Sequence, residues 1–191
     1  MDYSKILILS DVDSTLAREG QISDENIEAI RYFIGKGGRF SVATGRTARH
    51  IYETYMPRLT VNAPLATING TVITENDASE VLWKSPLEKD FYDIIEFIRK
   101  NAHDLEDIRA YRCDEVVSCD ENFDGNDGYE YFKILTVTKT IDSALEIKKL
   151  LRENFGNTKE ILRSWPVGVE IMEKRAGKGE SLKKIKELTG Q

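Results

Sequence analysis

The chain has 191 residues, of which 40% are hydrophobic and 31% charged, and its formal net charge is -6 at pH 7. This composition is typical of a globular protein, and no apolar run approaches the roughly 20 residues of a membrane-spanning helix. The acidic balance argues against nucleic acid as the main partner, because nucleic-acid binding needs a basic face. The N-terminus lacks a signal-peptide layout, so we expect a cytoplasmic protein with free thiols at Cys113 and Cys119 and no zinc site.

Strands and helices alternate in the first part of the chain. The expected elements are strand 5–10, helix 24–36, strand 39–44, helix 45–56 and strand 63–70. Ser23 is a good N-cap for the first helix, and Gly37 and Gly38 end it. Alternation with short connections predicts a parallel sheet with right-handed crossovers.

The pattern changes near residue 80. Residues 80–86 are typical of a strand or a linker. The elements expected after them are helix 87–102, strands in 108–119 and 129–140, a helix at 142–155 capped by Asp142, strands in 159–173, and a last helix at 177–190. We therefore expect an inserted α/β domain at 80–170 and a first domain made of 1–79 plus 171–191.

Two aspartates follow the first strand in the stretch ILILSDVDSTL. Asp11 and Asp13 share one side of an extended chain, and the carboxyl ends of parallel strands form the ligand-binding edge of an open α/β sheet. Like charges this close repel, so a metal, a charged ligand or solvent must offset the cost. An EF-hand is excluded, because its sixth and twelfth positions would be Leu16 and Ile22. Taken alone, the pair is explained equally well by a solvated loop.

Three further polar motifs follow later core elements. Thr44, Gly45 and Arg46 end the second strand, where a hydroxyl and a helix N-terminus suit an anion. Asn69 precedes a glycine and either makes an ordinary turn or turns its amide toward the same crevice. Lys178 lies between two glycines before the last helix and is either a surface lysine or a cation for the site.

Together these motifs resemble those of the haloacid dehalogenase superfamily, and most closely its Cof-type branch of sugar-phosphate phosphatases with an α/β cap. DVDSTL resembles the first motif, ATGR the second, and GKGESL the lysine motif. The resemblance implies a Rossmann-like parallel-sheet core with an inserted α/β cap domain. It also implies a magnesium-dependent phosphohydrolase that acts on a small phosphorylated metabolite, such as a sugar phosphate. Ser14 departs from the family, which usually has glycine there.

The resemblance also implies a role for each residue. Asp11 would be the nucleophile that forms an aspartyl-phosphate, and Asp13 would be the general acid and base. An Asp11 oxygen and the Asp13 backbone carbonyl would hold Mg²⁺, which prefers oxygen ligands and keeps several waters. Thr44 and Lys178 would complete the catalytic set by contacting the phosphoryl group. The residues expected nearer the substrate are Ser14, Thr15, Gly45, Arg46 and Asn69.

The fourth motif of the family, G-D-x-x-x-D, is absent from the sequence after the last helix. We therefore expect a truncated form with weak magnesium binding, impaired hydrolysis and a sheet edge that favours self-association. The alternatives to a phosphatase are a phosphomannomutase-like phosphotransferase and a non-catalytic phosphate- or metal-binding domain.

A second acidic stretch lies between the predicted strands of the inserted domain. Asp120, Asn122, Asp124 and Gly125 match the first half of a calcium loop, but the twelfth position is Tyr131 and the flanks are predicted strands. A solvated loop is the expected reading, and calcium is the alternative. If another carboxylate completes a metal site, these acids are the first candidates.

Overall fold

The computed structural model describes residues 2–87, 90–123, 125 and 127–190. Two compact units make up the chain, a first unit of Met1–Lys84 with Gly177–Gln191 and a second unit of Ser85–Ala176. These limits differ from the expected domains at both junctions. Residues 81–84 belong to the first unit because they form its last antiparallel strand. Residues 171–173 complete the last strand of the second unit, and this unit extends to Ala176.

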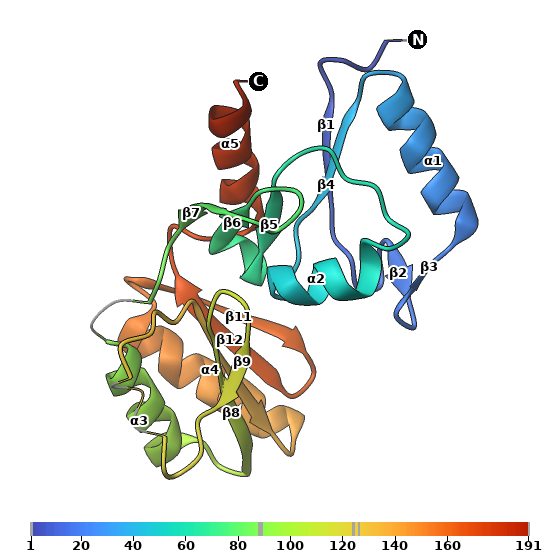
Figure 1. Cartoon of the computed structure of the whole chain (residues 1–191). Coiled ribbons are helices and arrows are strands. Elements are labelled where there is room, and N and C mark those ends of the chain that lie inside the picture. Colours follow the sequence, from blue (N-terminus) through green and yellow to red (C-terminus); the bar gives the residue numbers. More distant parts are fainter. Residues whose placement is uncertain (1, 88–89, 124, 126, 191) are drawn as a thin grey trace. The chain divides into compact units, whose positions relative to one another are not determined.

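The first unit is built around parallel strands (Figure 1). Its elements are β1 (Leu7–Ser10), β2 (Ala17–Arg18), β3 (Gln21–Ile22), α1 (Asp24–Gly35), β4 (Arg39–Val42), α2 (Ala48–Tyr55), β5 (Leu65–Thr67), η1 (Ile68–Gly70), β6 (Val72–Thr74), β7 (Val81–Lys84) and α5 (Lys178–Thr189). β1 pairs in parallel with β4, and a parallel bridge from Ala43 to Ala66 continues the order to β5. β6 and β7 extend this arrangement in the antiparallel sense. The predicted parallel α/β core is therefore confirmed.

Helices cover the strands of the first unit through two apolar clusters. The larger one joins Ile27 and Ile30 of α1 and Ile51 of α2 to Phe40 and Val42 of β4. These strand residues alternate along β4, as expected for side chains that point to one face of a strand. In the smaller cluster, Ile185 of α5 packs with Ala66 and Ile73 of β5 and β6. This packing anchors α5 to the first unit and thereby fixes where its first residue lies.

The first residues of the helices show whether the predicted N-caps are right. The Ser23 side chain accepts a hydrogen bond from the Asn26 N–H, which confirms the first cap. For α4 (Ile141–Phe155) the prediction of Asp142 is wrong, because Thr140 accepts from the Ser143 N–H and the helix begins at Ile141. Asp142 lies in the first turn instead, where a negative charge still interacts well with the helix dipole.

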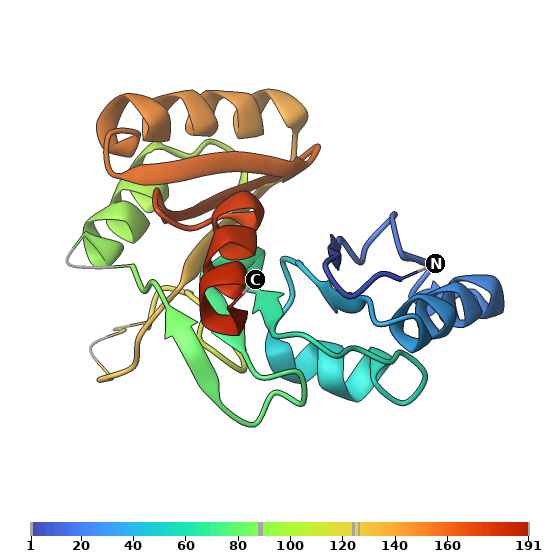
Figure 2. The same ribbon diagram turned by 90° about the horizontal axis from the view of Figure 1, so that it is seen from above.

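The second unit is an antiparallel sheet with helices on one face (Figure 2). Its elements are α3 (Phe91–Asn101), β8 (Leu105–Tyr111), β9 (Val116–Ser118), β10 (Lys133–Thr138), α4, β11 (Lys159–Trp165) and β12 (Gly168–Glu173). The strand order is β11-β12-β10-β8-β9. Ile94 and Ile147 of the two helices pack against Ile134 and Ile171 of the central strands, so this unit has a core of its own.

The predicted self-association depends on whether one edge of β1 is left without a neighbouring strand. Among the strands that the structure describes, β1 pairs with β4 alone. Ile6 and Ile8 keep 43% and 40% of their surface exposed. Association through this edge stays a prediction. Separately, none of the helices within the described ranges is long and apolar enough to span a membrane.

Candidate active site

The carboxyl end of β1 brings Asp11 next to Lys178, the first residue of α5. The Lys178 Nζ lies 2.6 Å from Asp11 Oδ2, while Asp11 Oδ1 accepts a hydrogen bond of 2.7 Å from the Val12 N–H. Both ion-paired side chains remain about 40% exposed (40% for Lys178 and 39% for Asp11). A ligand from solvent can therefore reach this carboxylate and its counter-charge together.

Asp13 is held by a different cation. Arg46 forms a bidentate pair with it, in which Nε donates to Asp13 Oδ2 at 2.9 Å and Nη2 donates to Oδ1 at 2.7 Å. These hydrogen bonds hold the pKa of Asp13 below its usual value. Asp13 is then a carboxylate in this conformation, which is the form that accepts a proton. The sequence motifs place both residues at the sheet edge but do not show that they pair.

The loop after β4 is tied to the turn after β5. Thr44 Oγ1 accepts from the Arg46 N–H at 3.2 Å, and the Thr44 side chain is fully buried. The Asn69 N–H donates to the Thr44 carbonyl at 2.7 Å, and the Ile68 N–H donates to the Arg46 carbonyl at 2.9 Å. In this conformation Thr44 therefore shapes the loop and does not face solvent. Gly45 lies within the same loop and is half-buried.

The turn that contains Asn69 has a backbone role that the sequence did not reveal. Ile68, Asn69 and Gly70 all have left-handed φ values, of 49°, 59° and 88°. A Cβ added to Gly70 would lie 2.6 Å from the carbonyl oxygen of Gly177. Gly70 thus lets the turn touch the residue immediately before Lys178. In the sequence, only the glycines at positions 70 and 177 hint at this approach, because glycine allows two backbones to come close.

Ser14 and Thr15 lie in the exposed loop after the aspartates. Ser14 has a φ of 59°, and its N–H donates to the Ala17 carbonyl at 3.0 Å. Glycine adopts this left-handed conformation at no steric cost, which accounts physically for the usual glycine at this position of the motif. The Thr15 N–H donates to the Val12 carbonyl at 3.3 Å, so both residues lie in a tight turn directly after the aspartates.

Replacing Ser14 by glycine should stabilise the protein. We expect the free energy of unfolding to rise by about 1 kcal/mol, because the relief of left-handed strain exceeds the added chain entropy. Urea unfolding measures the change. Thr15→Gly is the matched control, since Thr15 is outside the left-handed region and its substitution should destabilise. If Ser14→Gly lowers the free energy of unfolding as much as the control does, the left-handed conformation of Ser14 does not strain the protein.

The Asp11 carboxylate and the Asp13 backbone carbonyl are the oxygens that suit the metal implied by the motif, since both Asp13 carboxylate oxygens pair with Arg46. They supply oxygen donors on an accessible loop, and Mg²⁺ binds such oxygens while keeping several waters. Within the described part of the chain, no group of three or more His, Cys, Asp or Glu side chains could hold a metal ion. The donor set fits Mg²⁺ in kind, and water would have to supply most of the ligands.

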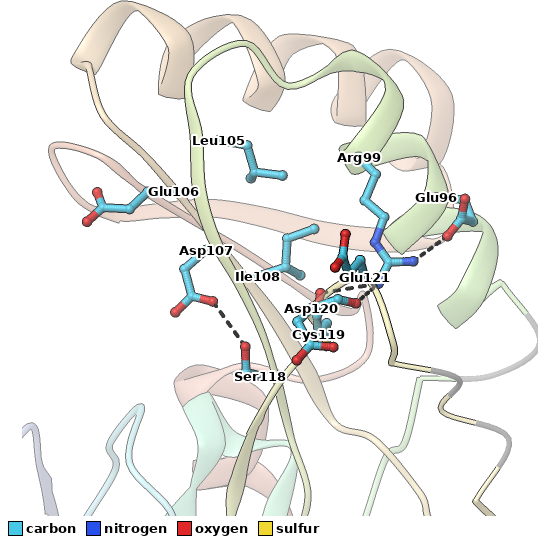
Figure 3. Close-up of a pocket in the computed structure, with 10 residues that line it drawn as sticks. All are labelled: Glu96, Arg99, Leu105, Glu106, Asp107, Ile108, Ser118, Cys119, Asp120 and Glu121. Atoms are coloured by element: carbon cyan, nitrogen blue, oxygen red, sulfur yellow. Dashed lines mark hydrogen bonds and ion pairs between the residues drawn. The ribbon is translucent and has the colours of Figure 1, made fainter.

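A separate cavity lies in the second unit and has a volume of about 630 Å³ (Figure 3). Acidic side chains dominate its lining, and they are Glu96, Glu106, Asp107, Asp120 and Glu121. Arg99 pairs with Glu96 and donates to the carbonyl oxygens of Cys119, at 3.2 Å, and Asp120. Arg99 therefore anchors the start of the acidic loop that follows Cys119.

The calcium alternative for this loop is not tested by the described residues. The Asp120 side chain accepts from the Asn122 N–H at 2.9 Å, as in an ordinary turn, but Asp124 lies outside the described residues. Beside it, burial raises the pKa of the Cys119 thiol to about 12. Cys119 is therefore not a reactive thiolate at neutral pH.

Known proteins share both the sequence pattern and the fold. The family model of haloacid dehalogenase-like hydrolases matches residues 8–126 and 110–190. A protein of Haemophilus influenzae, whose name proposes phosphatase activity, is 25% identical in an alignment of 197 positions that covers 94% of this chain and 72% of that protein.

Solved structures show the same fold at lower identity. A haloacid dehalogenase-like hydrolase from B. subtilis has a TM-score of 0.82 and 17% identity over 96% of this chain and 79% of its own. One from Bacteroides thetaiotaomicron has a TM-score of 0.80 and 22% identity, covering 100% and 78%. A sugar phosphatase of subclass IIB has a TM-score of 0.77 and 19% identity, covering 98% and 77%. Because the family model matches most of its length, the chain belongs to the haloacid dehalogenase-like hydrolases.

Proposed function

We propose that this protein is a magnesium-dependent phosphohydrolase that cleaves a small phosphorylated metabolite through an aspartyl-phosphate. The observation that carries the proposal is the 2.6 Å ion pair between Asp11 and Lys178 at the carboxyl end of β1. A carboxylate nucleophile must approach a phosphate that is also negative, and the lysine offsets this repulsion. The family supports hydrolase chemistry, and a sugar phosphate is favoured because one structural relative is a sugar phosphatase.

The proposed reaction has two steps. Before the first step, Asp13, a carboxylate in the described conformation, takes up a proton from solvent. In the first step, an oxygen of Asp11 attacks phosphorus in line, the bond from phosphorus to the leaving alcohol breaks, and Asp13 gives its proton to that alcohol and becomes a carboxylate again. In the second, Asp13 takes a proton from a water that attacks the aspartyl-phosphate, which releases phosphate and restores Asp11. Bound Mg²⁺ would neutralise charge on the phosphoryl oxygens.

The remaining residues of the site would position these groups. Thr44, Gly45 and Asn69 form the paired turns beside the attack site, and their backbone hydrogen bonds keep the loop in place. The exposed loop of Ser14 and Thr15 would border the substrate. The second unit, a sheet with its own core, would act as the cap that covers the site and selects the leaving group.

A phosphate-release assay tests the proposal. The purified protein is offered p-nitrophenyl phosphate and a panel of sugar phosphates, with Mg²⁺ or with EDTA. We expect phosphate release that EDTA abolishes and added Mg²⁺ restores, because charge on the phosphoryl group would otherwise stay unbalanced. Phosphorus NMR on the same samples detects isomers formed without phosphate release.

Each other result replaces the proposal with an alternative. Isomerisation without phosphate release would identify a phosphotransferase of the phosphomannomutase kind. Phosphate binding without any turnover would identify a non-catalytic domain. Full turnover in EDTA would contradict the metal requirement.

A further inference from the structure

We propose that His50 and Tyr55 are positioning residues that act on Asp13 through Arg46. They would fix the plane of the guanidinium, and the guanidinium would fix the Asp13 carboxylate in the orientation that proton transfer needs. This inference rests on the proposed function, in which Asp13 exchanges a proton with the leaving group.

Arg46 uses different nitrogens for its two partners. Nε and Nη2 face the two oxygens of Asp13, and Nη1 contacts His50 Nε2. The guanidinium is a rigid planar fork, so a contact at its third corner restrains rotation of the whole plane. Because the Asp13 side chain is 53% exposed, few other contacts would hold it in one rotamer.

His50 is itself held in place by the start of α2. Its N–H donates to the Thr47 side chain that caps this helix. An Arg46 N–H can only donate, so His50 Nε2 accepts in this arrangement and the imidazole is neutral. Burial and the nearby Arg46 lower the pKa of His50, in keeping with that neutral form.

Tyr55 gives the guanidinium a platform at the end of the same helix. Its ring centroid lies 5.8 Å from Arg46 Cζ and 6.4 Å from the His50 ring. The ring is buried, and its hydroxyl has no hydrogen-bond partner among the described residues. A phenylalanine would avoid that unpaired hydroxyl, so the aromatic face is the part that the arrangement uses.

The test separates proton transfer from general damage by varying the leaving group. An alkyl phosphate needs a proton on its leaving oxygen, whereas p-nitrophenolate leaves with little help. His50→Ala should lower kcat for an alkyl phosphate about tenfold, with a much smaller effect on p-nitrophenyl phosphate and little change in KM. His50→Gln keeps an acceptor oxygen and should recover part of the loss.

Further variants identify the route and the control. Arg46→Lys should behave like His50→Ala, because an ammonium cannot form the fork. The double variant Arg46→Ala with His50→Ala should be no worse than Arg46→Ala alone, since His50 acts through Arg46. Tyr55→Leu, which removes the aromatic face, should lower kcat for the alkyl phosphate in the same way as His50→Ala. Arg49→Ala, which removes an exposed arginine paired with Glu53 on the same helix, should match the parent.

The outcomes separate this inference from the proposed function. If the parent hydrolyses phosphate esters and His50→Ala slows both substrates equally or not at all, the inference is overturned and the function stands. If the parent hydrolyses none, NMR of the Arg46 Nε–H decides the inference alone. We expect this signal to move in Asp13→Asn and His50→Ala but not in Arg49→Ala. A signal that His50→Ala leaves in place overturns the inference.

Discussion

Replacing Asp11 by asparagine should abolish phosphate release while the fold stays intact. The amide is nearly the size of the carboxylate, and its oxygen can still accept the hydrogen bond from the Val12 N–H. It cannot form the aspartyl-phosphate, so turnover should fall by about 10⁴-fold or more, as for other covalent nucleophiles. Hydrolysis of p-nitrophenyl phosphate with Mg²⁺ gives the rate, and circular dichroism gives the fold.

A matched carboxylate controls for charge alone. Asp142→Asn removes a negative charge from the first turn of α4, outside the candidate site, and should retain parent activity. Activity of Asp11→Asn within a few-fold of the parent would remove Asp11 from the nucleophile role. If both variants lose activity, the loss in Asp11→Asn follows from the removed negative charge and does not identify Asp11 as the nucleophile.

The second large effect is expected at Gly70, which makes no chemical contribution of its own. An alanine Cβ would lie 2.6 Å from the Gly177 oxygen and 2.8 Å from the Gly177 carbonyl carbon, at a φ of 88° that alanine avoids. Since both neighbours are backbone atoms, the start of α5 must shift, and Lys178 moves with it. We expect turnover to fall about 10²-fold and the free energy of unfolding to fall by about 2 kcal/mol.

Gly179 provides the control from the same helix. A Cβ at Gly179 meets nothing within 4 Å, and its φ is not left-handed. Gly179→Ala should therefore keep activity and stabilise α5 by up to about 1 kcal/mol. Parent-like turnover in Gly70→Ala would mean that the position of Lys178 does not depend on the turn at Ile68–Gly70.

Local patterns predicted the parallel core because each element carries its own signal. The apolar run of β1 and the Ser23 cap of α1 both depend on neighbouring residues, so the sequence displays them. The α4 cap was wrong because Thr140 and Asp142 are both good caps, and only the observed helix start separates them. β7 was ambiguous because a short apolar run fits a strand or a linker equally well.

Long-range contacts at the site could not be predicted in this way. The resemblance placed Asp13 and Arg46 near one another, but their pairing depends on side-chain orientations in two separate loops. The approach of Gly70 to Gly177 joins distant parts of the chain through backbone atoms alone. No periodicity or spacing records a contact of this kind, because it is a property of the packed structure.

Asp11 and Lys178 lie far apart in the sequence, and this separation affects when their ion pair can form during translation. The ribosome makes Asp11 before the whole second unit, Ser85–Ala176, and makes Lys178 after it. A nascent chain halted within the second unit thus carries the carboxylate without its lysine, however well its first strands have folded. The proposed hydrolase activity could therefore begin only after the second unit has been translated and α5 has packed against the strands of the first unit.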